Sequence, residues 1–248
     1  MSACFGKSQD TKDTSLSLGR VVKPRALFFD LGGTLVGAWT DMLPLLRAAA
    51  RRAEVRVPWP EFLRANDETW EELWPSAPGL VGAIPSFADR VHEKALRRVG
   101  AIGSIERMVQ CIREEAVSPR WRPPFPETES ALRELRSLGL SLHIISNNVD
   151  YLPILLKNLG WTETFETVTY SQELGVAKPD PRLFRHALTR AGSSSEEALY
   201  IGDSWESDYL GARGIGMGAV WLNRAGNPAP EPCQQVRNLL EVRGLLRV

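Results

Sequence analysis

The chain has 248 residues, of which 43% are hydrophobic and 24% are charged. These proportions are typical of soluble globular proteins and exclude a disordered, collagen-like or fibrous chain. At about 150 residues per domain, the length suits one large domain or a domain with a smaller companion. Thirty basic residues balance thirty acidic ones. The basic footprint of a nucleic-acid-binding protein is therefore missing, and we expect no nucleic-acid partner.

The N-terminal residues 1–22 contain no apolar stretch of the kind that a signal peptide needs, so we expect a flexible tail. No apolar run approaches the ~18 residues of a membrane span. The cysteines are odd in number and widely separated, which predicts no disulfide framework and favours a reducing compartment; they are Cys4, Cys111 and Cys233. We therefore expect a cytoplasmic protein without a membrane partner. The sequence leaves its oligomeric state open.

Short apolar runs that end abruptly in polar residues or glycine predict strands buried on both faces. These runs cover residues 26–29, 140–145, 198–201 and 219–222, with a weaker candidate at 167–170. Apolar residues at helical spacing separate them at 127–138 and 181–191. Such alternation predicts the α/β fold class, with a doubly wound parallel sheet.

Residues 38–122 interrupt this alternation, because they show helical patterns without strands. The predicted helices cover residues 43–53, 59–74, 87–99 and 105–116, with a loop at 75–85 and a stiff proline-rich linker at 119–126. We therefore predict an α-helical domain, residues 38–122, inserted into an α/β core formed by residues 23–37 and 123–248. Four tryptophans of the insertion either line a pocket or pack inside its own core: Trp39, Trp59, Trp70 and Trp74.

Polar residues follow several of the predicted strands. Asp30, Ser146 and Asp203 come directly after them, and the carboxyl ends of parallel strands form the ligand crevice of open α/β sheets. Each residue alone would be expected to cap a helix, but together they indicate a site. Asp30 suits a nucleophile or a metal ligand, and Ser146 with its neighbouring amides suits a phosphoryl oxygen. Lys178 precedes a proline that favours an extended backbone, and Asp203 with Asp208 offers the hard oxygen ligands that Mg²⁺ prefers.

Four segments resemble the four motifs of the haloacid dehalogenase-like (HAD) hydrolases, in the subfamily with a helical cap between motifs one and two. The segments are FFDLGGTL, IISNN, GVAKPDPRLF and YIGDSWESDYLGARGIGM. The resemblance spans roughly residues 25–225. It implies a Mg²⁺-dependent phosphatase that acts on a small phosphorylated metabolite.

The resemblance also implies roles for individual residues. Asp30 would attack phosphorus and form an aspartyl-phosphate, while Ser146 and Lys178 would complete the catalytic set by binding and neutralising the phosphoryl group. The implied substrate-binding residues are Gly33, Thr34 and Asn147. The implied Mg²⁺ ligands are Asp30, the main-chain carbonyl of Gly32, Asp203 and Asp208.

One position departs from the family's phosphatases, in which motif one reads Asp-x-Asp and the second Asp is the general acid and base. Gly32 stands at that position, and loss of a positioned acid typically costs ~10²–10⁴ in rate. We therefore expect a weakened phosphatase, in which Gly32→Asp raises the turnover of alkyl phosphates. If wild type already hydrolyses an alkyl phosphate fast and Gly32→Asp slows it, another group is the acid, and His92, Glu93 and Lys94 of the cap are the candidates.

Three alternatives follow from the same glycine. The first is a catalytically degenerate HAD protein that binds a phosphorylated ligand or a protein partner. The second is a haloacid dehalogenase, which leaves the acid-rich GDSWESD segment without a role. The third is a phosphonatase-like hydrolase, in which Lys94, the only lysine of the insertion, would form a Schiff base.

Overall fold

A computed structural model describes residues 24–38, 42–81 and 85–246. Its centre is a six-stranded parallel sheet with the order β3-β2-β1-β4-β5-β6. The strands are β1 (Ala26–Phe29), β2 (Ser141–Ser146), β3 (Thr167–Tyr170), β4 (Ala198–Gly202), β5 (Gly218–Leu222) and β6 (Gln235–Val236). The α/β class and the parallel sheet are thus confirmed, and β6 is an addition to the predicted strands.

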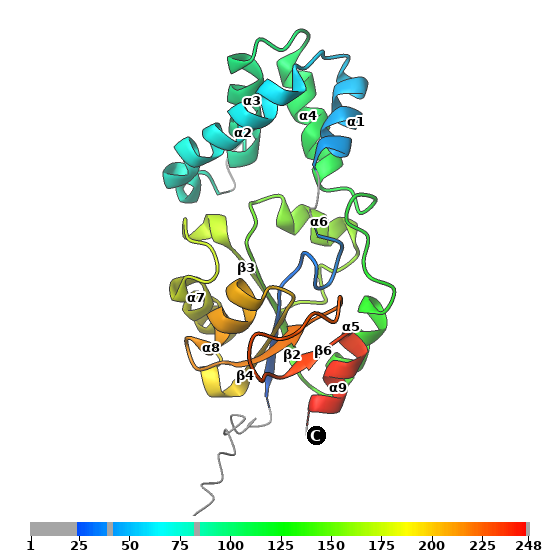
Figure 1. Cartoon of the computed structure of the whole chain (residues 1–248), viewed down its shortest axis with the longest axis vertical. Helices are drawn as coiled ribbons and strands as arrows, with labels where there is room; N and C mark the ends of the chain where they lie inside the picture. The colour runs from blue at the N-terminus through cyan, green and yellow to red at the C-terminus, as the bar shows by residue number, and fades with distance from the viewer. Residues whose placement is uncertain (1–23, 39–41, 82–84, 247–248) are drawn as a thin grey trace, which may run out of the picture.

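Helices cover both faces of the sheet, which explains why its strands are apolar throughout. In β1, Leu27 and Phe29 point into one apolar layer, while Ala26 and Phe28 point into the other, as the two-residue period of a strand requires. Helices α5 (Thr128–Ser137), α6 (Leu152–Asn158) and α9 (Val242–Leu245) supply the first layer. Helices α7 (Pro181–Ala191) and α8 (Gly211–Arg213) supply the second (Figure 1).

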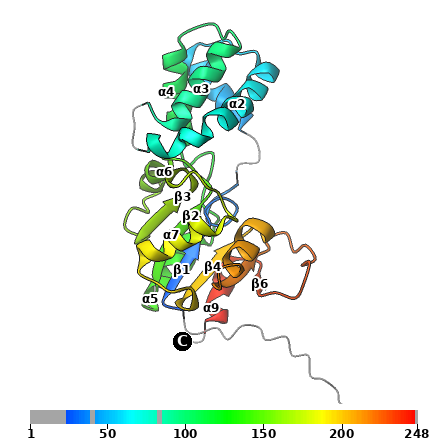
Figure 2. The same cartoon turned by 90° about the vertical axis from the view of Figure 1, so that its left-hand side faces the viewer.

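Four helices form a separate layer beyond the sheet, between β1 and α5 in the chain (Figures 1 and 2). They are α1 (Leu43–Ala53), α2 (Trp59–Leu73), α3 (Phe87–Arg98) and α4 (Ile105–Ala116). Helix α1 packs on α4 and α2 packs on α3, and the helices enclose an apolar cluster of their own. We call this insertion the cap. One expectation was wrong here: a 3₁₀ helix (η1, Trp74–Leu80) occupies most of the predicted loop at 75–85.

The two connections between the cap and the sheet run side by side. Val36 pairs with Pro124 in an antiparallel bridge, and the Gly37 N–H donates to the carbonyl of Pro123 at 3.0 Å. The Phe125 N–H donates to the carbonyl of Leu35 at 3.2 Å. The chain therefore leaves the core and returns to it through a short two-stranded ribbon, which holds both connections close to the end of β1.

Three further contacts join the cap to the segments that follow β2 and β3, including helix α6. The Tyr151 hydroxyl donates to Oδ1 of Asp89, on α3, at 2.5 Å. The Gln172 amide donates to the carbonyl of Ala77 at 3.1 Å, and the Asn158 amide donates to the carbonyl of Val117 at 2.8 Å. The cap is therefore closed over the carboxyl ends of the strands. Among the described residues, no helix is both long enough and apolar enough to cross a membrane.

Candidate active site

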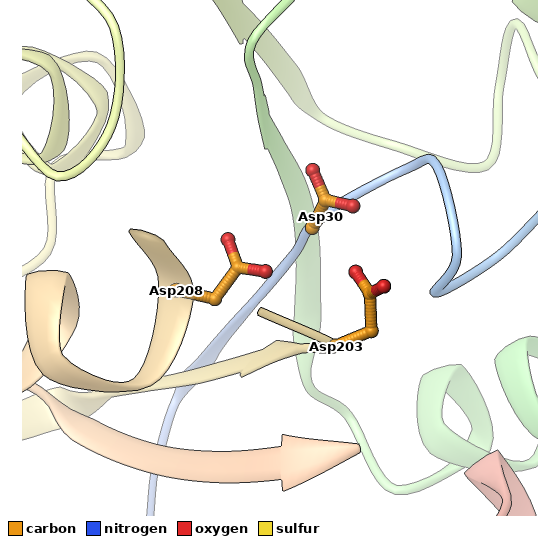
Figure 3. A group of neighbouring side chains, drawn as sticks. All are labelled: Asp30, Asp203 and Asp208. Atoms are coloured by element: carbon orange, nitrogen blue, oxygen red, sulfur yellow. The ribbon is translucent and has the colours of Figure 1, made fainter. Parts of the chain in front are cut away.

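Three carboxylates meet at the carboxyl ends of β1 and β4, where the sequence predicted them. Asp30 follows β1, Asp203 follows β4, and Asp208 lies in a π-helical turn (η4, Trp205–Leu210). Each offers an oxygen within 4.8 Å of the others, and Figure 3 shows the three side chains around one point. Asp208 is fixed by the Ser204 N–H, which donates to Oδ2 at 3.0 Å. Strands far apart in the chain therefore build one acidic centre.

Lys178 lies among these carboxylates and links two of them. Its ammonium donates to Asp30 Oδ1 at 2.7 Å and to Asp208 Oδ1 at 2.6 Å, and its side chain is only 3% exposed. Its third partner is the hydroxyl of Tyr200, at 2.8 Å. Burial lowers the pKa of Lys178, but Asp208 and Asp30 outweigh this effect and raise it overall. The lysine is therefore a fixed positive charge.

The acidic centre carries more negative charge than Lys178 balances. Burial, opposed by the attraction of Lys178, raises the pKa of Asp30 to about 6, and repulsion from Asp208 contributes. Burial and the charge of Asp208 also raise the pKa of Asp203. A cluster of buried carboxylates that disfavours its own ionisation is stabilised by a cation, and an all-oxygen set is the kind that a hard divalent cation prefers. The donor chemistry therefore fits Mg²⁺.

Tyr200 belongs to this network, although the sequence analysis did not identify it. It lies in the interior of β4, is fully buried, and donates its hydroxyl to Asp208 Oδ1 at 2.9 Å or to the carbonyl of Ile145 at 3.1 Å. Within a buried apolar run, a tyrosine resembles any other core aromatic. The signal that sets it apart is its hydroxyl, which needs a partner when buried.

Ser146 is the last residue of β2 and Asn147 follows it, beside the acidic centre. Both line the same cavity as Asp30, and Ser146 is 3% exposed. The Asn147 side chain holds the main chain of Lys178 from both sides, accepting from its N–H at 2.7 Å and donating to its carbonyl at 3.2 Å. These contacts fix the backbone from which the lysine reaches Asp30. In the structure, the Asn147 side chain therefore positions Lys178.

Gly33 and Thr34 shape the loop after Asp30 and are not among the residues that line the cavity. The Thr34 hydroxyl donates to Asp203 Oδ1 at 3.4 Å. Gly33 has a φ of +81°, and a Cβ there would lie 2.2 Å from Asp203 Oδ2. Only glycine therefore allows the two loops to approach so closely.

Arg224, two residues after the end of β5, is another residue that the sequence analysis left without a role. It donates to the carbonyls of Gly33 at 3.1 Å and Thr34 at 2.8 Å. Its guanidinium pairs with Glu127 at 2.6 Å and lies 3.6 Å from the ring centre of Phe125. The loop after Asp30 is thus anchored by the planar guanidinium of Arg224, which is itself held by Glu127 and Phe125.

Gly32 faces Arg122, from the second connection of the cap. A Cβ on Gly32 would lie 2.8 Å from Nη2 of Arg122, and Arg122 is only 4% exposed. Its Nε donates to the carbonyl of Gly37 at 3.4 Å. Burial, opposed by the charge of Asp30, lowers the pKa of Arg122 to about 10, so the group is still cationic at neutral pH. A guanidinium therefore adjoins the position at which the family's phosphatases carry the second Asp.

A cavity of about 820 Å³ extends from the acidic centre into the cap. Its cap side is mainly apolar, with residues that include Met42, Trp70, Trp74, Pro75, Ala88 and Ala116. Trp70 and Trp74 both line this cavity, and their rings stack with their centres 6.1 Å apart. Trp59 packs on Phe62 inside the cap, and Trp39 lies outside the described residues.

The candidate acids of the cap take different places. His92 lines the cavity and contacts Asn66 Oδ1 through Nδ1 at 2.9 Å, and burial lowers its pKa to about 4. Lys94 and Glu93 are not among the lining residues. Lys94 forms an ion pair with Glu72 instead, which removes the geometric basis for a Schiff base at Lys94.

The parallel sheet, the inserted cap and the acidic centre at the strand ends together define a haloacid dehalogenase-like hydrolase. The family model for haloacid dehalogenase-like hydrolases matches residues 24–216, and the chain belongs to this family. It is therefore a hydrolase, and the recognition from the four motifs is confirmed.

Individual relatives cover most of the chain. It is 37% identical to a phosphoserine phosphatase of Thermus thermophilus over 229 residues, which span 88% of this chain and 90% of the relative. It is 29% identical to a glyceraldehyde 3-phosphate phosphatase of Methanopyrus kandleri, over 84% of this chain and 88% of the relative. A solved 2-haloacid dehalogenase from Pseudomonas syringae shares the fold with a TM-score of 0.68 at 24% identity, over 90% of this chain and 98% of that one.

Proposed function

We propose that this protein is a Mg²⁺-dependent phosphatase that hydrolyses a small phosphorylated molecule through an aspartyl-phosphate on Asp30. The observation that carries the proposal is the buried Lys178, which donates to Asp30 at 2.7 Å and to Asp208 at 2.6 Å. This arrangement holds a nucleophilic carboxylate in one orientation beside a permanent positive charge. Phosphoryl transfer depends mainly on positioning and charge stabilisation, and relatives named as phosphatases support the same reaction class.

Each residue of the centre has a defined part in this reaction. Asp30 supplies the attacking oxygen, and Lys178 holds the carboxylate and neutralises charge on the phosphoryl group. Ser146 and the adjacent amides donate to a phosphoryl oxygen. The residues that would hold Mg²⁺ are Asp30, Asp203, Asp208 and the Gly32 carbonyl. When bound, the ion neutralises charge on the phosphoryl oxygens.

The test compares wild type with Asp30→Asn in a Mg²⁺-dependent assay on p-nitrophenyl phosphate and acetyl phosphate. We expect Asp30→Asn to abolish turnover without changing the unfolding midpoint by more than a few degrees. A matched control is Asp180→Asn, because Asp180 caps α7 on the surface and asparagine caps a helix about as well as aspartate. Full activity in Asp30→Asn would refute the proposal.

Metal binding is tested separately with Asp203→Ala. We expect this variant to weaken Mg²⁺ binding by at least about tenfold in calorimetric titration, because a charged oxygen ligand is lost. An unchanged Mg²⁺ affinity would place the ion elsewhere.

Gly32 supports a second candidate, a protein that binds a phosphorylated ligand and turns it over poorly. The two functions differ in one measurement. A binding protein would take up beryllofluoride with Mg²⁺, as a mimic of the aspartyl-phosphate, yet release no inorganic phosphate from p-nitrophenyl phosphate or acetyl phosphate.

A further inference from the structure

Arg122 lies in the cavity wall beside Gly32, close to Asp30. It lines the same cavity as Asp30 and Ser146. Gly32 leaves room for its Nη2, which lies 2.8 Å from the point that a Cβ would occupy on that glycine. The side chain is held by the ribbon that joins cap and core, because its Nε donates to the Gly37 carbonyl. A buried guanidinium on a fixed backbone is therefore part of the cavity wall beside the nucleophile.

We propose that Arg122 replaces the missing general acid with a positive charge, by contacting the leaving oxygen of the substrate and stabilising the anion that departs. This inference rests on the proposed phosphatase function. A guanidinium remains protonated in proteins, so it cannot supply a proton as the second Asp of the family's phosphatases does. It can instead stabilise negative charge that develops in the transition state.

The reaction balances without an acid at this position. An Asp30 oxygen forms a bond to phosphorus while the bond from phosphorus to the leaving oxygen breaks, and its electron pair stays on that oxygen. The oxyanion leaves without a proton, and until it leaves, its charge is stabilised by contact with Arg122. Water then attacks phosphorus, the bond to Asp30 breaks, and the protons of the water end on inorganic phosphate and the solvent buffer.

The same reasoning defines the substrate class. A leaving group that departs without a proton must be a stabilised anion, such as an aryl oxide or a carboxylate. The cavity above the acidic centre favours an apolar body on that group, since Trp70, Trp74 and Met42 line its cap side. The stacked tryptophans offer a flat surface, and burial keeps His92 neutral there at physiological pH because it lowers the pKa of that side chain. The structure therefore points to a phosphate carried by a conjugated oxygen on an apolar, preferably aromatic, body.

The experiment measures kcat/KM for a series of substituted phenyl phosphates whose leaving groups differ in pKa. In Arg122→Gln, we expect a steeper dependence of log(kcat/KM) on leaving-group pKa than in wild type. The loss should be small for nitrophenolate and reach ~10²–10³ for the poorest leaving group, as for removal of one oxyanion donor. Arg122→Lys keeps a positive charge at this position, so its slope should lie between those of wild type and Arg122→Gln. If Arg122→Gln does not fold, the slope of Arg122→Lys against that of wild type decides the question.

Arg120→Gln is the matched control, because Arg120 lies on the same connection but is 58% exposed and pairs with Glu115. It should keep the wild-type slope. A second arm compares benzoyl phosphate with acetyl phosphate, and we expect the lower KM for benzoyl phosphate. Trp74→Leu should raise KM for the benzoyl compound only.

Several results would overturn the inference. An equal loss for every leaving group would place Arg122 on the phosphoryl group or in a structural role. If wild type shows activity that depends on Asp30 and the slope does not change in Arg122→Gln, the inference fails and the phosphatase proposal stands. If no aryl or acyl phosphate is hydrolysed in an Asp30-dependent manner, both fail.

Discussion

The variant Gly32→Asp restores the carboxyl group that the family's phosphatases carry at this position, and the structure changes what it is expected to do. Gly32 is not among the glycines with positive φ, so its backbone accepts a side chain. The new Cβ would, however, lie 2.8 Å from Nη2 of Arg122. The guanidinium has to shift slightly, and the introduced carboxylate then pairs with it.

The size of the effect follows from that ion pair. A neighbouring cation lowers the pKa of an Asp by about 1–3 units from its ordinary value of about 3.9. At neutral pH, the protonated fraction of the introduced carboxyl is then about 10⁻⁴ or less. A general acid is worth ~10²–10⁴ when protonated, so the product of the two factors is at most about one. We therefore expect Gly32→Asp alone to leave alkyl phosphates as poor substrates, in contrast to the expectation from the sequence.

The double variant Gly32→Asp/Arg122→Gln separates the two groups. Without its cation, the introduced carboxyl lies beside Asp30 in a buried site and can hold a proton. Alkyl phosphate turnover should then exceed that of Arg122→Gln alone by at least about tenfold, within the range of one general acid. The assay is release of inorganic phosphate from glycerol phosphate and p-nitrophenyl phosphate by all four proteins. A gain above about tenfold on glycerol phosphate in Gly32→Asp alone would refute the reasoning.

Three other substitutions test parts of the site. Tyr200→Phe removes a buried hydroxyl that accepts from Lys178 at 2.8 Å. It should lower the free energy of unfolding by about 1–3 kcal/mol, measured by denaturant titration. It should also change kcat more than KM, with kcat falling, as steady-state kinetics would show. Tyr151→Phe removes the 2.5 Å contact to Asp89 of the cap, and should raise KM with little change in kcat, together with a larger radius of gyration in solution scattering. Burial lowers the pKa of His92 from 6.5 to about 4, so the unfolded chain binds a proton in that interval that the folded chain does not. The free energy of unfolding of wild type should therefore fall by up to about 3 kcal/mol more than that of His92→Gln as the pH drops from 6.5 to 4; equal pH dependence of the two proteins would contradict the burial argument.

The parts of the site that the sequence predicted are those fixed by local pattern. Asp30 and Asp203 follow solid apolar runs, and the end of a parallel strand places such residues at one edge of the sheet. The helices of the cap were likewise evident from apolar residues at helical spacing. The structure of the segment at 75–85 was harder to predict, because its prolines and glycines indicate a loop, whereas Trp74–Leu80 forms a 3₁₀ helix.

The parts that the sequence did not predict depend on contacts between distant segments. Arg122 is one arginine of a proline-rich linker, and only the fold brings it to Gly32, 90 positions earlier in the chain. Tyr200 looks like a core residue until Lys178 is placed beside its hydroxyl. Neither proximity leaves a trace in the spacing of apolar residues, so pattern alone could not assign either role.

The two-stranded ribbon that joins the cap to the core has a consequence for how such an enzyme can diversify in evolution. Val36 and Pro124 pair at its base, and Gly37 is tied to both Pro123 and Arg122. Helices α1 to α4 lie beyond these ties, so their residues and lengths can change without displacing Arg122 from its place beside Gly32 and Asp30. If Arg122 acts on the leaving group as proposed, the core and its connections set the choice of leaving group, whereas changes in the cap alter only the shape of the substrate body that fits.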